Sequence, residues 1–255
     1  MGLVDGRLAI VTGAGQGVGR GTALALATDG AAVAVLGRTA SNVNETCEEI
    51  HRRGGRSYPV IGNAHDRDDI QRMVEEAARA LGGVDILVNN ANYSSSSMGP
   101  LLSISDDDLV LGFMAGPVST LRFMKACYPH MKKRGRGDII NMVTSAMVRW
   151  DARNFGLYAA YKQAVRSLTR AAAHEWAPDG IRALNIAPHA TSPALKNWTL
   201  AKPEEAAEFT RSIPAGRIGD CELDIGRGIV ALLNKDLSYL TGATIPLDGG
   251  QAYFG

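Results

Sequence analysis

Short runs of aliphatic residues alternate with longer amphipathic segments along the chain, and this alternation restricts the possible fold more than any other feature. The runs lie at residues 8–12, 32–36, 58–62, 84–89, 138–143, 181–186 and 243–247. The clearest amphipathic segment has apolar residues at three- and four-residue spacing between Ile70 and Leu81, which predicts a helix with one apolar stripe. Apolar strands joined by helix-length connections are typical of a parallel sheet covered on both faces. The sequence therefore predicts a doubly wound α/β fold, a three-layer sandwich of about seven parallel strands with helices on both faces.

Composition limits the classes of partner. No Pro/Ser-rich linker, charge block or low-complexity stretch divides residues 1–255, so we expect a single domain. The 27 basic and 26 acidic residues give a net charge of +1, which favours a small-molecule partner over nucleic acid or an anionic membrane. Cys47, Cys127 and Cys221 are far apart and odd in number, as is typical of reduced thiols. Neither an export signal nor a run of roughly 20 apolar residues stands out, so we expect a cytoplasmic protein.

A glycine-rich turn follows the first apolar run. Residues 12–19 read TGAGQGVG and lead into an Ala/Leu-rich helical segment. Glycine lets backbone amides approach a phosphate closely, and a helix N-terminus adds unpaired N–H groups and a favourable dipole. The sequence therefore predicts a pyrophosphate site formed by Gly13, Gln16, Gly17, Val18 and Gly19.

The end of the second apolar run indicates which dinucleotide binds there. Dinucleotide enzymes that prefer NAD usually carry an acidic residue at this place, which binds the adenosine ribose 2′-OH. This chain has Gly37-Arg38 instead. A guanidinium binds a 2′-phosphate through charge-assisted hydrogen bonds, although arginine is also common on protein surfaces. We therefore expect NADP(H) to be favoured over NAD(H).

Tyr158 and Lys162 stand four residues apart at the start of a long helical pattern, which places them on one helix face. There the ammonium is expected to stabilise the phenolate and to lower the tyrosine pKa from about 10 towards working pH. Tyr128 and Lys132 share the spacing, but no serine stands thirteen residues before Tyr128, whereas Ser145 stands thirteen residues before Tyr158. We therefore interpret the second pair as structural and Tyr158 as a candidate general acid/base.

In order and spacing, Ser145, Tyr158 and Lys162 resemble the Ser-Tyr-Lys constellation of the short-chain dehydrogenases/reductases, and the T-G-x-x-x-G-x-G loop resembles the coenzyme loop of that family. The likeness is nearest to single-domain 3-oxoacyl reductases and hydroxysteroid dehydrogenases. It implies a Rossmann-like fold and an NADP(H)-dependent oxidoreductase that interconverts a carbonyl compound and a secondary alcohol by hydride transfer. Ser145 would bind the substrate oxygen, Tyr158 would exchange its proton, and Lys162 would hold the nicotinamide ribose. A homo-oligomer, tetramer or dimer, is common in the family and is expected here.

The same resemblance implies further coenzyme contacts. Asn63 takes the place of an aspartate that faces the adenine amino group, and its carbonyl oxygen still accepts hydrogen bonds. A loop after the fourth run and another after the sixth would face the ribose and the nicotinamide. The residues implied there are Asn89, Ala91, Pro188 and Thr191, with Ser192 as the alternative to Thr191.

Two neighbouring hydroxyls compete for the substrate oxygen. Counting forward from Asn141 along the fifth run places Thr144 where the family often has serine. The spacing to Tyr158 favours Ser145. Residues 94–97 and 193–202 are expected to be loops that set substrate selectivity.

The chain departs from the family pattern in four places. Asn92 and His189 stand where glycine is usual, Pro193 where threonine is usual, and Met114 where an active-site asparagine is usual. These departures leave open an alternative, a catalytically weakened coenzyme-binding regulatory or partner subunit of the same fold. Pro117 has no N–H, so it predicts a helix kink that exposes the carbonyl of residue 113 or 114.

The sequence gives no indication of a catalytic metal site. The histidines do not pair with one another at the spacing of metal ligands; they are His51, His65, His130, His174 and His189.

Overall fold

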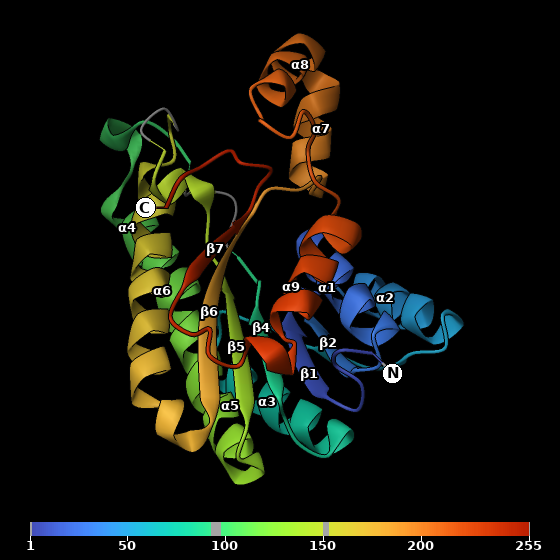
Figure 1. Ribbon diagram of the computed structural model, residues 1–255. Helices are drawn as coiled ribbons and strands as arrows, with labels where there is room; N and C mark the ends of the chain where they lie inside the picture. The colour runs from blue at the N-terminus through green and yellow to red at the C-terminus, as the bar shows by residue number, and fades with distance from the viewer. Residues whose placement is uncertain (1, 93–97, 150–152, 255) are drawn as a thin grey trace.

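The computed structural model describes residues 2–92, 98–149 and 153–254, and its described strands form one parallel sheet (Figure 1). The spatial order is β3-β2-β1-β4-β5-β6-β7, which reverses direction at β1 as in a Rossmann-like fold. The predicted doubly wound architecture is confirmed. The strands are β1 (Leu8–Thr12), β2 (Ala32–Gly37), β3 (Arg56–Ile61), β4 (Ile86–Asn89), β5 (Gly137–Met142), β6 (Ile181–Pro188) and β7 (Thr244–Leu247).

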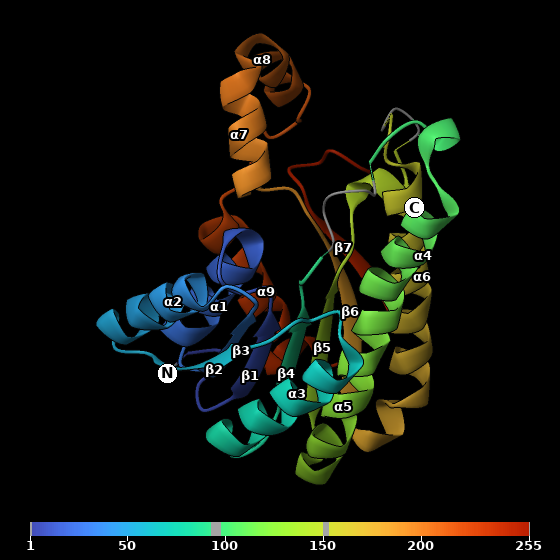
Figure 2. The ribbon, with the colours of Figure 1, turned by 180° about the vertical axis from the view of Figure 1, so that it is seen from behind.

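Helices cover both faces of the sheet. Helices α1, α2 and α9 lie on one face, and α3, α5 and α6 pack on the other; α3 and α5 are in front of the strands in Figure 2. Within the described residues, no helix has both the length and the apolar character needed to cross a membrane. The α-helices are α1 (Gly17–Thr28), α2 (Ala40–Arg52), α3 (Arg67–Leu81), α4 (Asp106–Phe113), α5 (Ser119–Arg134), α6 (Gly156–Glu175), α7 (Pro193–Ala201), α8 (Pro203–Arg211) and α9 (Arg227–Leu232). Short 3-10 turns are η1 (Leu101–Ser103), η3 (Ser145–Met147), η4 (Ala177–Asp179) and η6 (Lys235–Leu237), and π-helical turns are η2 (Met114–Val118) and η5 (Cys221–Gly226).

Helix α3 illustrates how local sequence signals set the elements. The Asp66 side chain caps its N-terminus by accepting hydrogen bonds from two backbone N–H groups, and Gly82 ends the helix in the left-handed conformation. The predicted apolar stripe is buried against the sheet. Periodicity and capping therefore placed this helix correctly.

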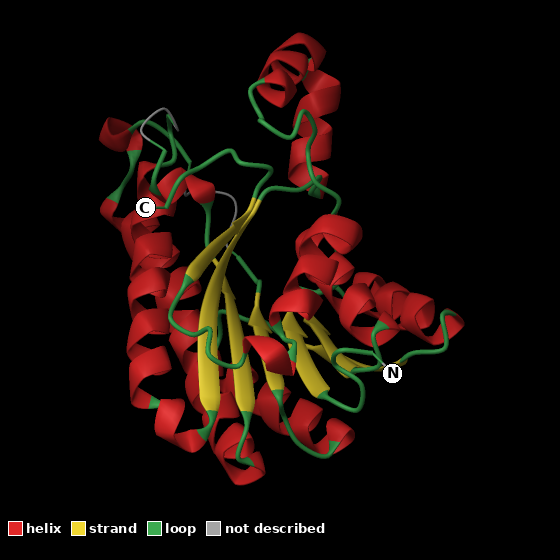
Figure 3. Ribbon diagram, in the orientation of Figure 1, coloured by secondary structure: helices red, strands yellow, loops and turns green. Residues whose placement is uncertain are grey.

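Loops at the carboxyl ends of the strands gather at one edge of the sheet, and α7 and α8 project beyond that edge (Figure 3). The expectation of a loop over residues 193–202 is wrong, because residues Pro193–Ala201 form α7. Pro193 is in the first turn, where a missing N–H costs nothing, and the Ser192 hydroxyl caps the helix. The expected loop at 94–97 lies outside the described residues.

The predicted helix distortion at Pro117 is confirmed as the π-helical turn η2, which joins α4 to α5. The expected freed carbonyl was that of Phe113 or Met114, and the Met114 carbonyl is not free. That carbonyl oxygen accepts a hydrogen bond from the Ser119 hydroxyl at 2.8 Å as well as from the Ser119 N–H.

Candidate active site

Hydrogen bonds join the loop after β1 to the loop after β4. The Thr12 hydroxyl oxygen accepts hydrogen bonds from the backbone N–H groups of Asn90 and Ala91, each at 3.0 Å. The Asn90 side-chain amide donates in turn to the carbonyl oxygens of Thr12 and Gly13, at 3.0 and 3.2 Å. Asn90 was not among the predicted site residues, although its place directly after a strand end was the available signal.

Glycines are required in this loop because the backbone turns tightly there. Gly13 and Gly17 have positive φ angles of 64° and 55°. A Cβ atom at Gly19 would overlap the carbonyl oxygen of Gly13 and the side-chain amide of Asn90. Among the described residues, the side chain of Gln16, the N-cap of α1, makes no capping hydrogen bond. The first N–H groups of α1 are therefore suited to a pyrophosphate.

Val18 contributes differently from the glycines. Its side chain packs against the apolar core beneath the loop, and its carbonyl accepts a hydrogen bond from the Thr22 hydroxyl at 2.8 Å. Only its backbone is therefore placed to meet a phosphate.

Arg38 is exposed directly after β2. Among the residues that the structure describes, no hydrogen bond or ion pair of its guanidinium is found. The neighbouring His65 lies between β3 and α3, and its pKa is lowered by burial first and by the positive charge of Arg38 second. A guanidinium that is exposed and not held by an acidic residue fits a 2′-phosphate.

Asn63 and Asn89 are placed at the ends of β3 and β4. The Asn63 side-chain oxygen accepts a hydrogen bond from the His65 N–H at 3.1 Å, which leaves a second lone pair for an adenine amino group. The buried Asn89 amide donates to the side-chain oxygen of Asn141 at 2.8 Å. Asn89 therefore supports the sheet edge, and the predicted ribose contact would come from its backbone.

Tyr158 and Lys162 lie on the first turns of α6. The Lys162 ammonium lies 5.8 Å from the centre of the Tyr158 ring and donates to the Met142 carbonyl oxygen at 2.7 Å. Lys162 is only 5% exposed, and this burial lowers its pKa to about 8.

Burial raises the pKa of the Tyr158 phenol, Tyr161 adds to the rise, and a hydrogen bond from the Thr144 side chain opposes it. The expected lowering of the tyrosine pKa is therefore wrong for this arrangement. The physical reason is that the Lys162 ammonium lies over the aromatic ring and is held by a carbonyl, so it does not reach the phenolic oxygen.

The two competing hydroxyls point to different partners. The Thr144 hydroxyl accepts a hydrogen bond from the Ala146 N–H at 3.2 Å, and its side chain opposes the rise in the Tyr158 pKa that burial causes. The Ser145 hydroxyl donates to a side-chain oxygen of Asp248 at 2.6 Å. These contacts do not decide between the two hydroxyls, and the preference for Ser145 drawn from spacing stays a prediction.

The loop after β6 lies against the glycine loop. The Pro193 ring is 3.2 Å from the position of a Cβ atom at Gly17. Pro188 ends β6, and Thr191 uses its N–H and its hydroxyl to bind the Gly219 carbonyl, at 2.9 and 3.4 Å. The Ser192 hydroxyl caps α7. Thr191 is exposed beside the predicted nicotinamide position.

Two of the sequence departures have structural partners. The Asn92 side-chain oxygen accepts a hydrogen bond from the Tyr161 hydroxyl at 3.1 Å. The His189 ring packs edge-to-face on the Phe209 ring of α8, 5.3 Å between centres, and burial lowers its pKa. Both residues therefore have packing roles within the catalytic edge.

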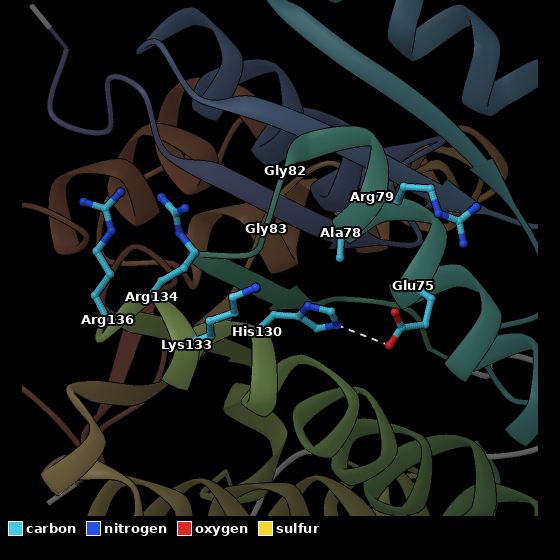
Figure 4. A pocket seen from close by; sticks show the side chains of 9 residues that line it. All are labelled: Glu75, Ala78, Arg79, Gly82, Gly83, His130, Lys133, Arg134 and Arg136. Atoms are coloured by element: carbon cyan, nitrogen blue, oxygen red, sulfur yellow. Dashed lines mark hydrogen bonds and ion pairs between the residues drawn. The ribbon is translucent and has the colours of Figure 1, made fainter.

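A hollow of about 640 Å³ lies at the opposite edge of the sheet, between α3 and α5 (Figure 4). Its basic lining includes Arg134 and Arg136, which both bind the buried carboxylate of Asp85. None of the predicted catalytic residues reaches it. Among residues 2–92, 98–149 and 153–254, no group of three or more His, Cys, Asp or Glu side chains is arranged to hold a metal ion.

Comparison with known proteins agrees with this geometry. A family model described as enoyl-(acyl carrier protein) reductase matches residues 13–252. The chain is 36% identical over 258 residues to a 12alpha-hydroxysteroid dehydrogenase of Clostridium sp., covering 98% of each chain. It is 33% identical over 252 residues to a 7alpha-hydroxysteroid dehydrogenase of Clostridium sardiniense, covering 98% of this chain and 94% of that one.

Solved structures also resemble this chain over nearly their whole length. A 7 alpha-hydroxysteroid dehydrogenase complexed with NADH and 7-oxo glycochenodeoxycholic acid superposes with a TM-score of 0.90 at 29% identity, covering 98% of this chain and 95% of that one. A putative NAD(P)-dependent gluconate 5-dehydrogenase from Beutenbergia cavernae with bound NADP gives a TM-score of 0.89 at 33% identity, covering 97% of each. The chain therefore belongs to the short-chain dehydrogenase/reductase family.

Proposed function

We propose that this protein is an NADP(H)-dependent oxidoreductase that interconverts a ketone and a secondary alcohol, with Tyr158 as the general acid/base. The observation that carries the proposal is the convergence of Tyr158 and Lys162 on α6 with the loop that holds Thr144 and Ser145, at the same sheet edge as the glycine loop. A catalytically weakened binding subunit is disfavoured, because a protein that only binds coenzyme has no need of this arrangement.

The coenzyme fits the residues of this edge. Backbone N–H groups of the glycine loop and of α1 would bind the pyrophosphate, Arg38 the 2′-phosphate, and Asn63 the adenine. The loops that contain Ala91 and Thr191 would flank the nicotinamide riboside, and Lys162 would bind its ribose. When bound, NADPH supplies the hydride.

The residues of the chain supply orientation and the proton. Burial favours the protonated form of Tyr158, which is the form that donates a proton to a substrate oxygen during carbonyl reduction. We assign the contact with the substrate oxygen to Ser145, as its spacing to Tyr158 predicts, with the neighbouring Thr144 as the alternative. Lys162 lies beneath the ring and keeps the phenol facing the loop after β5.

The substrate we propose is a secondary alcohol or ketone on a bulky apolar skeleton, as in the hydroxysteroids named for two relatives. Leu101 packs against Gly156, two residues before Tyr158, yet remains largely exposed, and Leu102 and Met98 are exposed beside it. Leu200 is exposed on α7. Burial of such side chains by an apolar substrate is favourable.

We also propose that the protein forms a homo-oligomer, as its family resemblance implies. Val110, Leu111 and Met114 are exposed on α4 and η2, where a second copy would cover them. Light scattering coupled to size-exclusion chromatography tests this part of the proposal, and a monomeric mass would refute it.

The catalytic proposal is tested by incubating the protein with NADPH and, separately, with NADH in the presence of steroid, β-ketoacyl and quinone carbonyl compounds. Loss of absorbance at the reduced nicotinamide band reports hydride transfer. We expect oxidation of NADPH only when a carbonyl substrate is present, and fastest with a steroid ketone. Absence of oxidation with every carbonyl compound, despite coenzyme binding, would favour the weakened binding subunit.

A further inference from the structure

Tyr161 is a further tyrosine on α6, and its side chain is fully buried against α4 and η2. Cβ atoms at Gly112 and Gly116 would lie 3.2 and 2.7 Å from its ring, so these two glycines provide the space that the ring fills. Met114 stands between them, where an active-site asparagine is usual, and is 40% exposed. The buried polar group at this place is therefore the Tyr161 phenol.

The Tyr161 ring packs beside the catalytic residues. Its centre lies 5.3 Å from the centre of the Tyr158 ring with the two planes at 89°, which is an edge-to-face contact. The Lys162 ammonium lies 6.0 Å from the centre of the Tyr161 ring. Because none of its surface is exposed, Tyr161 supports the reacting phenol without touching the substrate.

The Tyr161 hydroxyl reaches from this cluster to the loop after β4. It donates a hydrogen bond to the side-chain oxygen of Asn92 at 3.1 Å. The preceding residues of the loop, Asn90 and Ala91, donate their N–H groups to the hydroxyl of Thr12 at the end of β1, each at 3.0 Å. The loop after β4 is therefore bound to the coenzyme side of the site by its first residues and to the catalytic helix by Asn92.

We propose that Tyr161 is a positioning residue, whose hydroxyl binds Asn92 and thereby holds the loop after β4, and with it the nicotinamide end of the coenzyme, at a fixed place relative to Tyr158. This inference rests on the proposed function, in which Ala91 flanks the nicotinamide riboside. It gives Asn92 a role that the glycine usual at this position could not have, because glycine has no side chain to accept the hydrogen bond.

The test compares the Kd of NADPH with the Kd of adenosine 2′,5′-bisphosphate, which is the adenosine end of NADPH without the nicotinamide. The variants of the full-length protein are Tyr161→Phe, Asn92→Ala and the two combined. The proposed adenosine contacts of Arg38 and Asn63 follow other strands, β2 and β3, and do not depend on the Tyr161 hydroxyl.

The two Kd values should respond differently. One net hydrogen bond corresponds to roughly two- to tenfold in an equilibrium constant. We expect each single variant to weaken NADPH binding by that factor, because the coenzyme must then order the loop itself. The combined variant should be no weaker than the weaker single variant, and the Kd of the bisphosphate should stay unchanged in all three.

Turnover is the second measurement. Misplacement of a reacting group by about 1 Å costs up to roughly a hundredfold in rate, so we expect kcat with the best carbonyl substrate to fall by about tenfold in Tyr161→Phe. This variant keeps the ring and its contact with Tyr158. Asn92→Asp keeps an acceptor oxygen for the Tyr161 hydroxyl and should retain the parental kcat and the parental Kd of NADPH.

Tyr128→Phe is the matched control. The Tyr128 hydroxyl on α5 also donates to a side-chain oxygen, that of Asp179, at 2.5 Å. Asp179 precedes β6, at the amino ends of the strands, so this contact is remote from the proposed coenzyme site. The control should leave kcat and both Kd values unchanged.

An unchanged Kd of NADPH in Tyr161→Phe would overturn the inference, and so would equal weakening of NADPH and the bisphosphate. Additive losses in the combined variant would also overturn it, because the two side chains would then act separately. The binding measurements need no turnover. A parental protein that binds NADPH but reduces no carbonyl compound would refute the proposed function, and the two Kd values would still decide the inference. A parental protein that binds no NADPH would refute both.

Discussion

Burial acts in opposite directions on the two ionisable residues of the catalytic helix. It raises the pKa of the Tyr158 phenol and lowers that of the Lys162 ammonium to about 8, so both neutral forms are favoured. Lys162 offsets part of its desolvation by donating to the Met142 carbonyl. At slightly alkaline pH Tyr158 is therefore protonated and Lys162 is only partly charged.

Replacement of Tyr158 by phenylalanine tests the acid/base role directly. The ring and its packing remain while the proton is lost, so we expect kcat to fall by the roughly 10²–10⁴-fold expected of a missing general acid/base. The Kd of NADPH, measured by fluorescence titration, should change little. A variant that reduces the preferred substrate at nearly the parental rate would refute the assigned mechanism.

The Lys162 pKa predicts a dependence of stability on pH. Between about pH 8 and 10.5 the unfolded chain retains a proton on Lys162 that the folded protein has released, so the free energy of unfolding rises with pH across this window. Below about pH 8 both states are protonated and the folded state bears the cost of a buried charge. Lowering a pKa from 10.5 to about 8 corresponds to about 3 kcal/mol.

Urea unfolding of the parental protein and of Lys162→Met at pH 7.5 and pH 10 measures this effect. Other titrating groups are common to both proteins and cancel in the difference. We expect the parental protein to gain up to about 3 kcal/mol relative to the variant as pH rises. A difference that is independent of pH would mean that the buried lysine is as well solvated as in the unfolded chain.

Sequence spacing identified Tyr158 and Lys162 because both stand on one regular helix, where distance along the chain fixes distance in space. The spacing to Tyr158 favours Ser145 over Thr144, and this preference stays a prediction. The strand count from Asn141 and the count back from Tyr158 differ by one residue across an irregular connection. The hydrogen bond from Ser145 to Asp248 joins residues 103 positions apart, and no local pattern encodes it.

At the scale of elements, the α4–η2–α5 helix owes its irregular turn to several residues acting together. Pro117 removes one backbone donor, and Ser119 binds the Met114 carbonyl. Gly116 brings the turn against the ring of Tyr161 on α6, whose hydroxyl reaches Asn92. The turn therefore connects α6 to the loop after β4.

Gly116→Ala should disturb this contact. A Cβ atom at position 116 would lie 2.7 Å from the ring of Tyr161, which is fully buried and has no space into which to move. Overpacking of this kind costs about 1–3 kcal/mol, measured as a lower urea midpoint with an unchanged slope. A urea midpoint equal to that of the parental protein would show that η2 and α6 can move apart without loss of stability.

Element types followed from local patterns, and their ends agree with the predicted runs to within a few residues. Strand β3 is a clear example, predicted at 58–62 and observed at Arg56–Ile61. Helix α7 was missed because its nine residues begin with proline and carry no strong apolar stripe, so they read as a loop. A kink was predicted at Pro117, but its π-helical form was not. That form depends on the Ser119 side chain as well as on proline.

At the scale of the molecule, a parallel sheet gathers residues from distant parts of the sequence at one edge. The glycine loop, Arg38, Asn63, Thr144 and Thr191 follow five different strands, and all lie at carboxyl ends. The basic hollow at the other edge contains none of them. A ligand that spans the carboxyl edge contacts both halves of the sheet and should stabilise the whole fold.

Coenzyme-dependent stability tests this expectation and the choice of coenzyme together. A ligand that binds only the folded state at about 100 times its Kd adds about 2.7 kcal/mol to the free energy of unfolding. At equal concentrations, we expect NADPH to raise the urea midpoint more than NADH, because only NADPH carries the 2′-phosphate for which Arg38 is exposed. Arg38→Ala removes a charge-assisted contact of about 1.5–3 kcal/mol, so it should weaken NADPH binding by roughly tenfold to a hundredfold and leave the NADH midpoint unchanged. The matched control is Arg56→Ala, which removes an equally exposed arginine from the start of β3 at the opposite edge of the sheet. This variant should retain the parental difference between the urea midpoints measured with the two coenzymes.

Equal stabilisation by NADPH and NADH in the parental protein would mean that residues other than Arg38 set the coenzyme selectivity. A preference for NADPH that survives Arg38→Ala would mean the same.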